Sequence, residues 1–179
     1  VWTYTDPDRT GMLDFVFADG FGYETYANYA LDVPMYFAKR GGQYVDLAGR
    51  SFRKFMAGEL EELPGDRPSI KDWADHTTTA FPEVRLKQYL EMRGADSGPW
   101  SRLCALPALW AGIFYDQAAL AAAWDLCKDW QVEDHERLRA DVARLGLKAQ
   151  VNGRSVPAVA KDMVALAKQG LKNRNRPTP

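Results

Sequence analysis

The chain has 179 residues, of which 46% are hydrophobic and 26% are charged, and its formal net charge at pH 7 is −1. This length and balance are typical of a single globular domain with a core, and they exclude a disordered or fibrous chain. Acidic and basic residues are interspersed along the sequence rather than grouped in basic blocks, so we expect no nucleic-acid partner.

The cellular setting is predicted from the apolar segments and the cysteines. The longest apolar run, residues 103–115, contains Pro107 and is shorter than the ~20 residues of a membrane-spanning helix, so we expect no membrane partner. Cys104 and Cys127 lie in apolar stretches without disulfide or zinc spacing, which predicts reduced core cysteines and a cytoplasmic protein. The chain starts without an initiator Met or the order of a signal peptide, and we expect it to be part of a longer protein.

The first half of the chain predicts short elements of both kinds. Residues 13–17 predict a short strand, and residues 20–33 show helical spacing of apolar side chains. Residues 34–47 predict a β-hairpin, because Gly41 and Gly42 can adopt the positive φ of a tight turn.

Two short helices and one long strand should follow. The first helix is expected to be capped by Ser51, because serine is a favoured N-cap residue, and the second to cover residues 69–80 after a loop with Pro and Gly. Residues 84–93 then alternate between apolar and polar side chains, which predicts one long, half-buried strand. Its polar face would carry Arg85, Lys87, Tyr89, Glu91 and Arg93.

The second half of the chain changes character after Pro99. Four segments rich in Ala and Leu have helical spacing, with Asp116 expected to cap one helix and Gly146 and Gly170 expected to end two others. Strands followed by helices indicate an α+β fold with the helices packed on one side of an antiparallel sheet. We assign residues 1–97 to the sheet-containing part and residues 98–179 to the helical region of the same domain.

The polar face of the long strand is a candidate site. Glu91 and Arg93 are two residues apart, so their Cα atoms would lie about 6.6 to 6.8 Å from each other on one side of the strand. A carboxylate provides oxygen ligands for Mg²⁺, and a guanidinium group binds phosphate or carboxylate oxygens. The alternative is a solvated face with weak ion pairs.

Several sequence blocks resemble one enzyme family. FPEVRLK (81–87), YLEMRGAD (89–96), GPW (98–100), LCALPALW (103–110), ALDVPMYF (30–37) and DPDRTGM (6–12) follow the pattern of glutamate-cysteine ligases of the plant and proteobacterial type. The resemblance covers essentially the whole chain. It implies a catalytic domain like that of glutamine synthetase, with an antiparallel sheet curved around the site. It also implies ATP-dependent joining of glutamate to cysteine, the first step of glutathione biosynthesis, with Mg²⁺ as the metal.

The resemblance also assigns roles to the charged face. It implies that Glu91 is a metal ligand and that Arg93 contacts nucleotide phosphate or the phosphoryl group in transfer. Arg85 would be a second cationic contact in the catalytic site, with a structural ion pair as the alternative.

Three further residues are candidates for substrate binding. Arg9 would bind a substrate carboxylate, or else stabilise a turn through a salt bridge. Tyr29 and Tyr36 would line an amino-acid pocket, or else belong to the core.

Full-length members of this family have a long N-terminal half that is missing from this chain. That half holds further acidic metal ligands, the nucleotide-binding part and arginines for glutamate. We therefore expect a C-terminal portion that is incomplete alone and that pairs with the missing half or self-associates. Two alternatives are a related γ-glutamyl ligase of another thiol pathway and a non-catalytic fragment that only packs on a partner chain.

Overall fold

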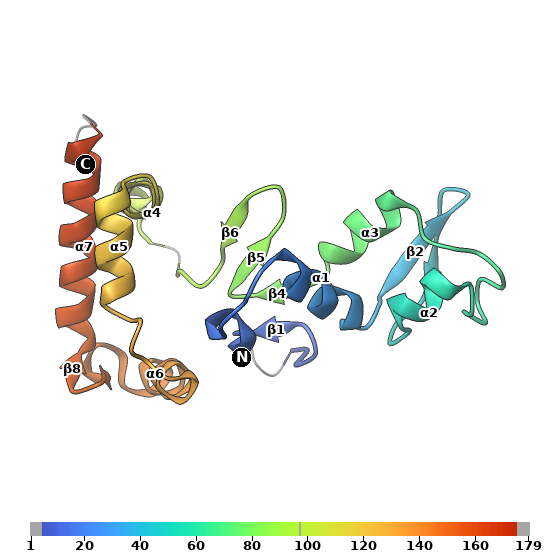
Figure 1. Cartoon of the computed structure of the whole chain (residues 1–179), viewed down its shortest axis with the longest axis horizontal. Coiled ribbons are helices and arrows are strands. Elements are labelled where there is room, and N and C mark those ends of the chain that lie inside the picture. The colour runs from blue at the N-terminus through green and yellow to red at the C-terminus, as the bar shows by residue number, and fades with distance from the viewer. Residues whose placement is uncertain (1–4, 97, 175–179) are drawn as a thin grey trace. The chain divides into compact units, whose positions relative to one another are not determined.

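The computed structural model describes residues 5–96 and 98–174 (Figure 1). The chain divides into two compact units, residues 1–95 and 96–179, which we call unit 1 and unit 2. The division lies close to the change from short mixed elements to Ala- and Leu-rich helices in the sequence. Each unit therefore buries its own apolar side chains, and the two are described separately.

Unit 1 consists of short helices and paired short strands. In chain order its elements are β1 (Thr10–Gly11), the 3₁₀ helix η2 (Asp14–Phe17), α1 (Tyr23–Asp32), β2 (Phe37–Arg40), β3 (Gln43–Asp46), α2 (Phe52–Ala57), α3 (Ile70–Thr77), β4 (Phe81–Pro82), β5 (Val84–Leu86) and β6 (Leu90–Met92). Within the described residues the strands pair two by two, β1 with β4 in parallel and the others as antiparallel hairpins. The larger curved sheet stays a prediction.

The local signals in residues 5–80 of unit 1 agree with the structure except at η2. The hairpin β2–β3 is confirmed, and its turn residues Gly41 and Gly42 have φ values of 57° and 80°. Ser51 caps α2, where its Oγ accepts a hydrogen bond from the Lys54 N–H, and Ser69 forms a capping box with α3. The strand expected at residues 13–17 is wrong, because this segment closes its own 3₁₀ hydrogen bonds rather than pairing with another strand.

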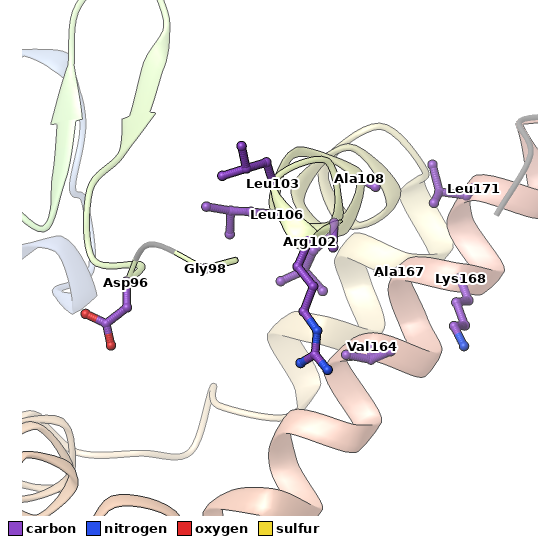
Figure 2. Close-up of a pocket in the computed structure, with 12 residues that line it drawn as sticks. Asp96, Gly98, Arg102, Leu103, Leu106, Ala108, Val164, Ala167, Lys168 and Leu171 are labelled. Carbon is purple, nitrogen blue, oxygen red and sulfur yellow. The ribbon is translucent and has the colours of Figure 1, made fainter. Parts of the chain in front are cut away.

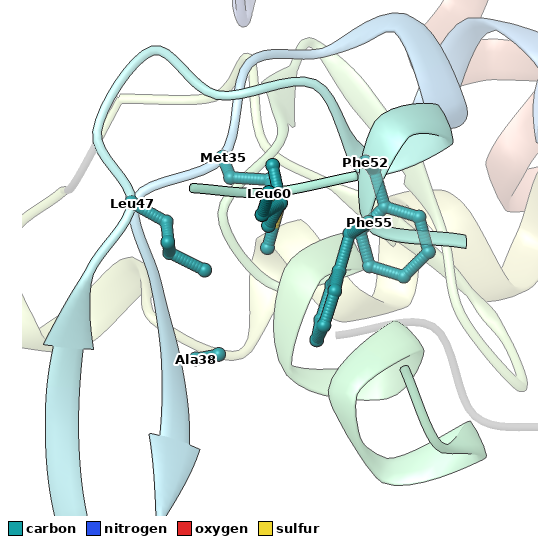
Figure 3. Close-up of a cluster of buried hydrophobic side chains, with 6 residues drawn as sticks. All are labelled: Met35, Ala38, Leu47, Phe52, Phe55 and Leu60. Carbon is teal, nitrogen blue, oxygen red and sulfur yellow. The ribbon is translucent and has the colours of Figure 1, made fainter. Parts of the chain in front are cut away.

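The core of unit 1 is a cluster of buried apolar side chains between the first hairpin and α2 (Figure 3). Its members are Met35, Ala38, Leu47, Phe52, Phe55 and Leu60. Trp73 of α3 packs against the cluster and lies edge-on to the Phe52 ring, with 5.3 Å between the ring centroids. This packing joins α3 to the hairpin and so positions the segment that leads into β4.

Residues 84–93 form a hairpin rather than one long strand. The chain turns after β5, and Arg85 pairs directly with Glu91 on β6. Paired residues of a hairpin point to the same side, so the alternation in the sequence survives the turn. The burial is the reverse of the expectation, because Arg85 is 7% exposed whereas Val84 and Leu90 are 42% and 60% exposed.

Unit 2 is mainly helical. Its elements are the 3₁₀ helix η3 (Trp100–Arg102), α4 (Ala105–Phe114), α5 (Gln117–Asp125), α6 (Val132–Leu145), the 3₁₀ helix η4 (Gly146–Lys148), β7 (Gln150–Val151), β8 (Arg154–Ser155) and α7 (Val156–Asn173). As predicted, the Asp116 carboxylate caps α5 by accepting from the Ala119 N–H at 2.8 Å, and α6 ends at Gly146. The tight hairpin β7–β8, which turns at Asn152 and Gly153, was not expected, although Asn-Gly is a strong hairpin signal.

Helices α4 and α7 of unit 2 cross at very close range. A Cβ atom at Gly112 would lie 2.2 Å from the Ala167 carbonyl oxygen, and one at Gly170 would lie 1.9 Å from the Gly112 carbonyl oxygen. The expectation that Gly170 ends a helix is therefore wrong. Gly170 lies inside α7 because this position needs a residue without a side chain.

Among the described helices, none is long and apolar enough to cross a membrane alone. The segments Trp100–Phe114 and Gln117–Asp125 meet the length and composition together, but they are bent by 94°.

Candidate active-site wall

The charged side of the β5–β6 hairpin is organised around Arg85. Its Nη1 donates to the carbonyl oxygens of Thr78 at 2.7 Å and Ala80 at 3.0 Å. Its Nε and Nη2 both contact Oε2 of Glu91 at 2.7 Å. Arg85 is buried and each of its three nitrogens already has a partner, which favours the alternative of a structural ion pair. Its catalytic contact stays a prediction.

Arg93 is held less tightly than Arg85. Its Nη1 lies 3.4 Å from Oε2 of Glu91, and its guanidinium carbon lies 5.4 Å from the centroid of the Phe81 ring. Within the described residues the Arg93 Nε is buried and has no hydrogen-bond partner. Arg93 therefore keeps donor groups with which it can bind an anion.

Glu91 is the only acidic partner that the described residues give to these two guanidinium groups. The hydrogen bond from Arg85 and the charges of both arginines lower the pKa of Glu91, against a smaller opposing effect of burial. The carboxylate is therefore ionised at neutral pH and forms the negative centre of a cluster with a formal charge of +1.

These residues do not fit a magnesium site. Mg²⁺ takes six oxygen ligands, but the described residues contain no group of three or more acidic, His or Cys side chains that could hold a metal ion. One oxygen of Glu91 is already bound by two guanidinium groups, whose positive charge opposes a divalent cation at the other oxygen. The contacts of Glu91 within this chain do not favour the metal-ligand role, which stays a prediction.

Arg9 belongs to a closed network and not to an open substrate site. Its Nε contacts Asp6 at 2.5 Å, its Nη1 contacts Oγ1 and O of Thr79 at 3.2 and 3.3 Å, and its Nη2 donates to Pro34 O at 2.8 Å. The Tyr36 ring lies 3.5 Å from the guanidinium carbon, and the Tyr36 hydroxyl donates to Asp6 at 2.5 Å. These contacts are those of the alternative, a turn-stabilising salt bridge, and Tyr36 belongs to the same network. The substrate roles of Arg9 and Tyr36 stay predictions.

Tyr29 lies in an aromatic cluster on α1. The centroids of Phe15 and Tyr26 are 5.6 and 5.7 Å from that of Tyr29. Burial raises the pKa of Tyr29 to about 12, so its hydroxyl stays protonated at neutral pH. This packing is typical of a core aromatic residue, which was the alternative. The contact of Tyr29 with a substrate stays a prediction.

Among the described residues, the sequence interpretation missed a hollow in each unit. In unit 1 an apolar groove lies along the other face of the β5–β6 hairpin, and Tyr23, Tyr26 and Tyr89 line it together with Val84 and Leu86. The sequence signal was that Val84, Leu86 and Leu90 share one parity, but alternation alone does not show which face is buried. In the structure Val84 and Leu90 are exposed.

The second hollow lies in unit 2 between α4 and α7 (Figure 2). It has a volume of about 410 Å³. Leu103, Leu106 and Val164 form an apolar wall, and the cationic side chains of Arg102 and Lys168 also line the hollow. The described residues show no ion pair for either cation.

The cysteines differ from the expectation of two core residues. Cys104 is exposed beside the start of α4, whereas Cys127 is partly buried. Both are free thiols, and burial raises the pKa of Cys127.

Comparison with known proteins identifies the family. The family model described as "Glutamate-cysteine ligase family 2(GCS2)" matches residues 1–179, so the chain belongs to glutamate-cysteine ligase family 2. The chain is 57% identical to the chloroplastic glutamate–cysteine ligase of Arabidopsis thaliana and 56% identical to that of Nicotiana tabacum. Each comparison covers 97% of this chain and 33% of the relative. The corresponding protein of Brassica juncea is 56% identical, and the match covers 97% of this chain and 34% of that protein.

These relatives confirm the resemblance and correct one expectation. Each of them is named as chloroplastic, which overturns the cytoplasmic location inferred from the two cysteines. Reduced thiols do not distinguish these compartments, so that inference was too narrow. The chain spans about a third of the length of the curated relatives that it matches, which agrees with the expectation that much of the protein lies outside it.

Proposed function

We propose that this chain is part of an ATP-dependent glutamate-cysteine ligase that forms γ-glutamylcysteine, the first product of glutathione biosynthesis. The observation that carries the proposal is the family match over the whole chain, at 56% to 57% identity to three proteins named as this ligase. The charged side of the β5–β6 hairpin supports it, because Arg93 keeps donors for an anionic group.

In the proposed reaction, ATP phosphorylates the side-chain carboxylate of glutamate. The amine of cysteine then attacks the acyl phosphate, so that the C–N bond forms as the bond to phosphate breaks. Mg²⁺, when bound, would offset the charge of the phosphates. A Mg²⁺ site would need ligands from parts of the protein outside this chain, since the described residues contain no group of three or more side chains that could hold a metal ion.

Arg93 is the residue of this chain to which we assign contact with the nucleotide phosphate or the phosphoryl group in transfer. Its buried Nε and its position beside the Phe81 ring give the guanidinium a defined place at the edge of the hairpin. A guanidinium group at this place can stabilise negative charge that develops during transfer.

The test compares the complete protein with this chain alone. The complete protein should form ADP and γ-glutamylcysteine only when glutamate, cysteine and ATP are all present, and this chain alone should form neither. Arg93→Ala in the complete protein should lower kcat about a hundredfold, whereas Arg67→Ala, at an exposed position, should leave it unchanged. Product formation by the chain alone, or near-normal activity of Arg93→Ala, would contradict the proposal.

The same experiment separates the packing alternative from the two ligase readings. A ligase of another thiol pathway would form the same γ-glutamylcysteine. It is distinguished by identifying the thiol that is made from this product in the source cells. A fragment that only packs on a partner chain would belong to a protein without ATP turnover. Sedimentation velocity on this chain tests the expected self-association, and a monodisperse monomer would contradict it.

A further inference from the structure

The two arginines on the hairpin have unequal surroundings but share one carboxylate oxygen. Arg85 is fixed by two backbone carbonyls in addition to Glu91, and its side chain is 9% exposed. In the described part of the chain, the Arg93 side chain contacts Glu91 at 3.4 Å and lies beside the Phe81 ring, and it is 23% exposed. Glu91 therefore connects a fixed guanidinium group to one that is free to bind a ligand.

We propose that Glu91 is a positioning residue, which orients Arg93 for an oxyanion by linking it to the fixed Arg85. Arg85 serves as the anchor because its carbonyl contacts tie it to the segment before β4. A guanidinium group that is already oriented loses less conformational entropy when it binds an anion than a mobile one does. The identity of the ligand in this inference rests on the proposed function. The geometry of the Arg85–Glu91–Arg93 cluster does not depend on it.

The ligand class is a phosphate or carboxylate group. The two guanidinium groups and one carboxylate leave a formal charge of +1, and the buried Nε of Arg93 is a donor without a partner in the described part of the chain. Nucleotide phosphate, inorganic phosphate and the carboxylate of an amino acid share this chemistry. Separate titrations with magnesium-free ATP, inorganic phosphate and glutamate distinguish these sources.

Glu91→Asp is the decisive variant. It keeps the charge of the cluster and any capacity for metal binding, but it shortens the side chain by one methylene, so that the carboxylate no longer reaches both arginines. Glu83→Asp is the matched control, because Glu83 carries a partly buried carboxylate near Gly94 for which the described residues show no arginine partner. Glu91→Gln is less suitable, since it raises the charge of the cluster and alters anion attraction by itself.

The experiment follows the side-chain Nε–H signals of Arg85 and Arg93 by NMR on this chain. In the unsubstituted chain at least one of the three anions should shift the Arg93 signal and leave the Arg85 signal in place, and Mg²⁺ alone should shift neither. Glu91→Asp should broaden the Arg93 signal and weaken that anion's binding about tenfold, the effect of losing one charge-assisted contact. Glu83→Asp should leave the affinity unchanged.

Three results would overturn the inference. One is that Glu91→Asp binds the anion as tightly as the unsubstituted chain, and another is that none of the three anions shifts the Arg93 signal. The third is saturable binding of Mg²⁺ that is lost in Glu91→Gln, which would restore the metal-ligand role. The proposed function fails separately, because a complete protein without γ-glutamylcysteine synthesis would leave the binding measurements on this chain intact.

Discussion

Arg9 and Arg85 donate hydrogen bonds to neighbouring carbonyl groups of one short segment. Arg9 Nη1 contacts Thr79 O at 3.3 Å, and Arg85 Nη1 contacts the oxygens of Thr78 and Ala80 at 2.7 and 3.0 Å. Both side chains are buried, and so are the acceptor residues Thr79 and Ala80, so these donors satisfy carbonyl groups that water does not reach easily. The segment leads directly into β4, and its fixed position also places the ring of Phe81 beside Arg93.

The role of Arg9 can be tested through stability. Arg9→Lys should lower the free energy of unfolding of unit 1 by about 3 kcal/mol, because a lysine cannot reach Asp6, Pro34 and Thr79 together and leaves buried carbonyls without donors. Urea unfolding of this chain measures the change, with the exposed Arg67→Lys as a control that should be neutral. Normal stability with a raised KM for glutamate in the complete protein would instead support the substrate role.

His76 should make unit 1 less stable in mild acid. Its Nε2 lies 2.8 Å from Ala30 O, its ring stacks on Phe52, and burial lowers its pKa below the ordinary 6.5. The unfolded chain therefore takes up a proton at a higher pH than the folded chain does. The stability due to the neutral ring is complete above pH 6.5 and is lost as the pH falls through the pKa of the folded state.

The measurement is urea unfolding between pH 5 and pH 7.5, with hydrogen exchange of the unit 1 amides as the probe that reports on unit 1. His76→Gln should flatten the pH dependence in this range. The chain has two histidines, and the other one, His135, lies in unit 2, so His135→Gln should leave the slope of unit 1 unchanged. An equal slope in the His76→Gln variant would show that another group causes it.

Gly170→Ala should destabilise unit 2 despite the better helix propensity of alanine. The propensity gain is about 1 kcal/mol. The added Cβ would stand 1.9 Å from the Gly112 carbonyl oxygen, which forces the α4 and α7 backbones apart. We expect a net loss of about 2 kcal/mol or more, since overpacking against backbone usually costs about 1 to 3 kcal/mol and this contact is severe.

Thermal unfolding of unit 2 measures this loss. Lys161→Ala changes an exposed residue of the same helix and should be nearly neutral. A melting temperature of Gly170→Ala at or above that of the unsubstituted chain would disprove the close contact between α4 and α7.

The two cysteines should differ in reactivity. Cys104 is exposed, whereas Cys127 is partly buried and its pKa is raised by burial, so less of it is thiolate at a given pH. Titration with a thiol reagent should therefore show two free thiols, with Cys104 reacting first. Cys104→Ser should remove the fast phase only, and a native mass two protons below that of the reduced chain would reveal a disulfide and contradict the prediction.

Short-range signals in the sequence determined much of the local structure. The Gly41-Gly42 turn, the caps at Ser51 and Asp116 and the end of α6 at Gly146 depend on residues within one turn of each other, so their chemistry can be read from neighbouring positions. The family was also readable, because its long sequence blocks span the chain.

Tertiary structure alone decided which side of an element is buried and what each charge contacts. Alternation placed Arg85 and Glu91 on one face, but the carbonyl groups of residues 78 and 80 made that face the inner one. The sequence around Gly170 suggested a helix end. In the structure Gly170 lies inside α7, because the backbone of Gly112, which is far away in sequence, comes too close for a side chain. Arg9 likewise has its partners at Pro34 and Thr79. These residues come close to Arg9 only through the packing of unit 1, so the sequence around residue 9 does not predict them.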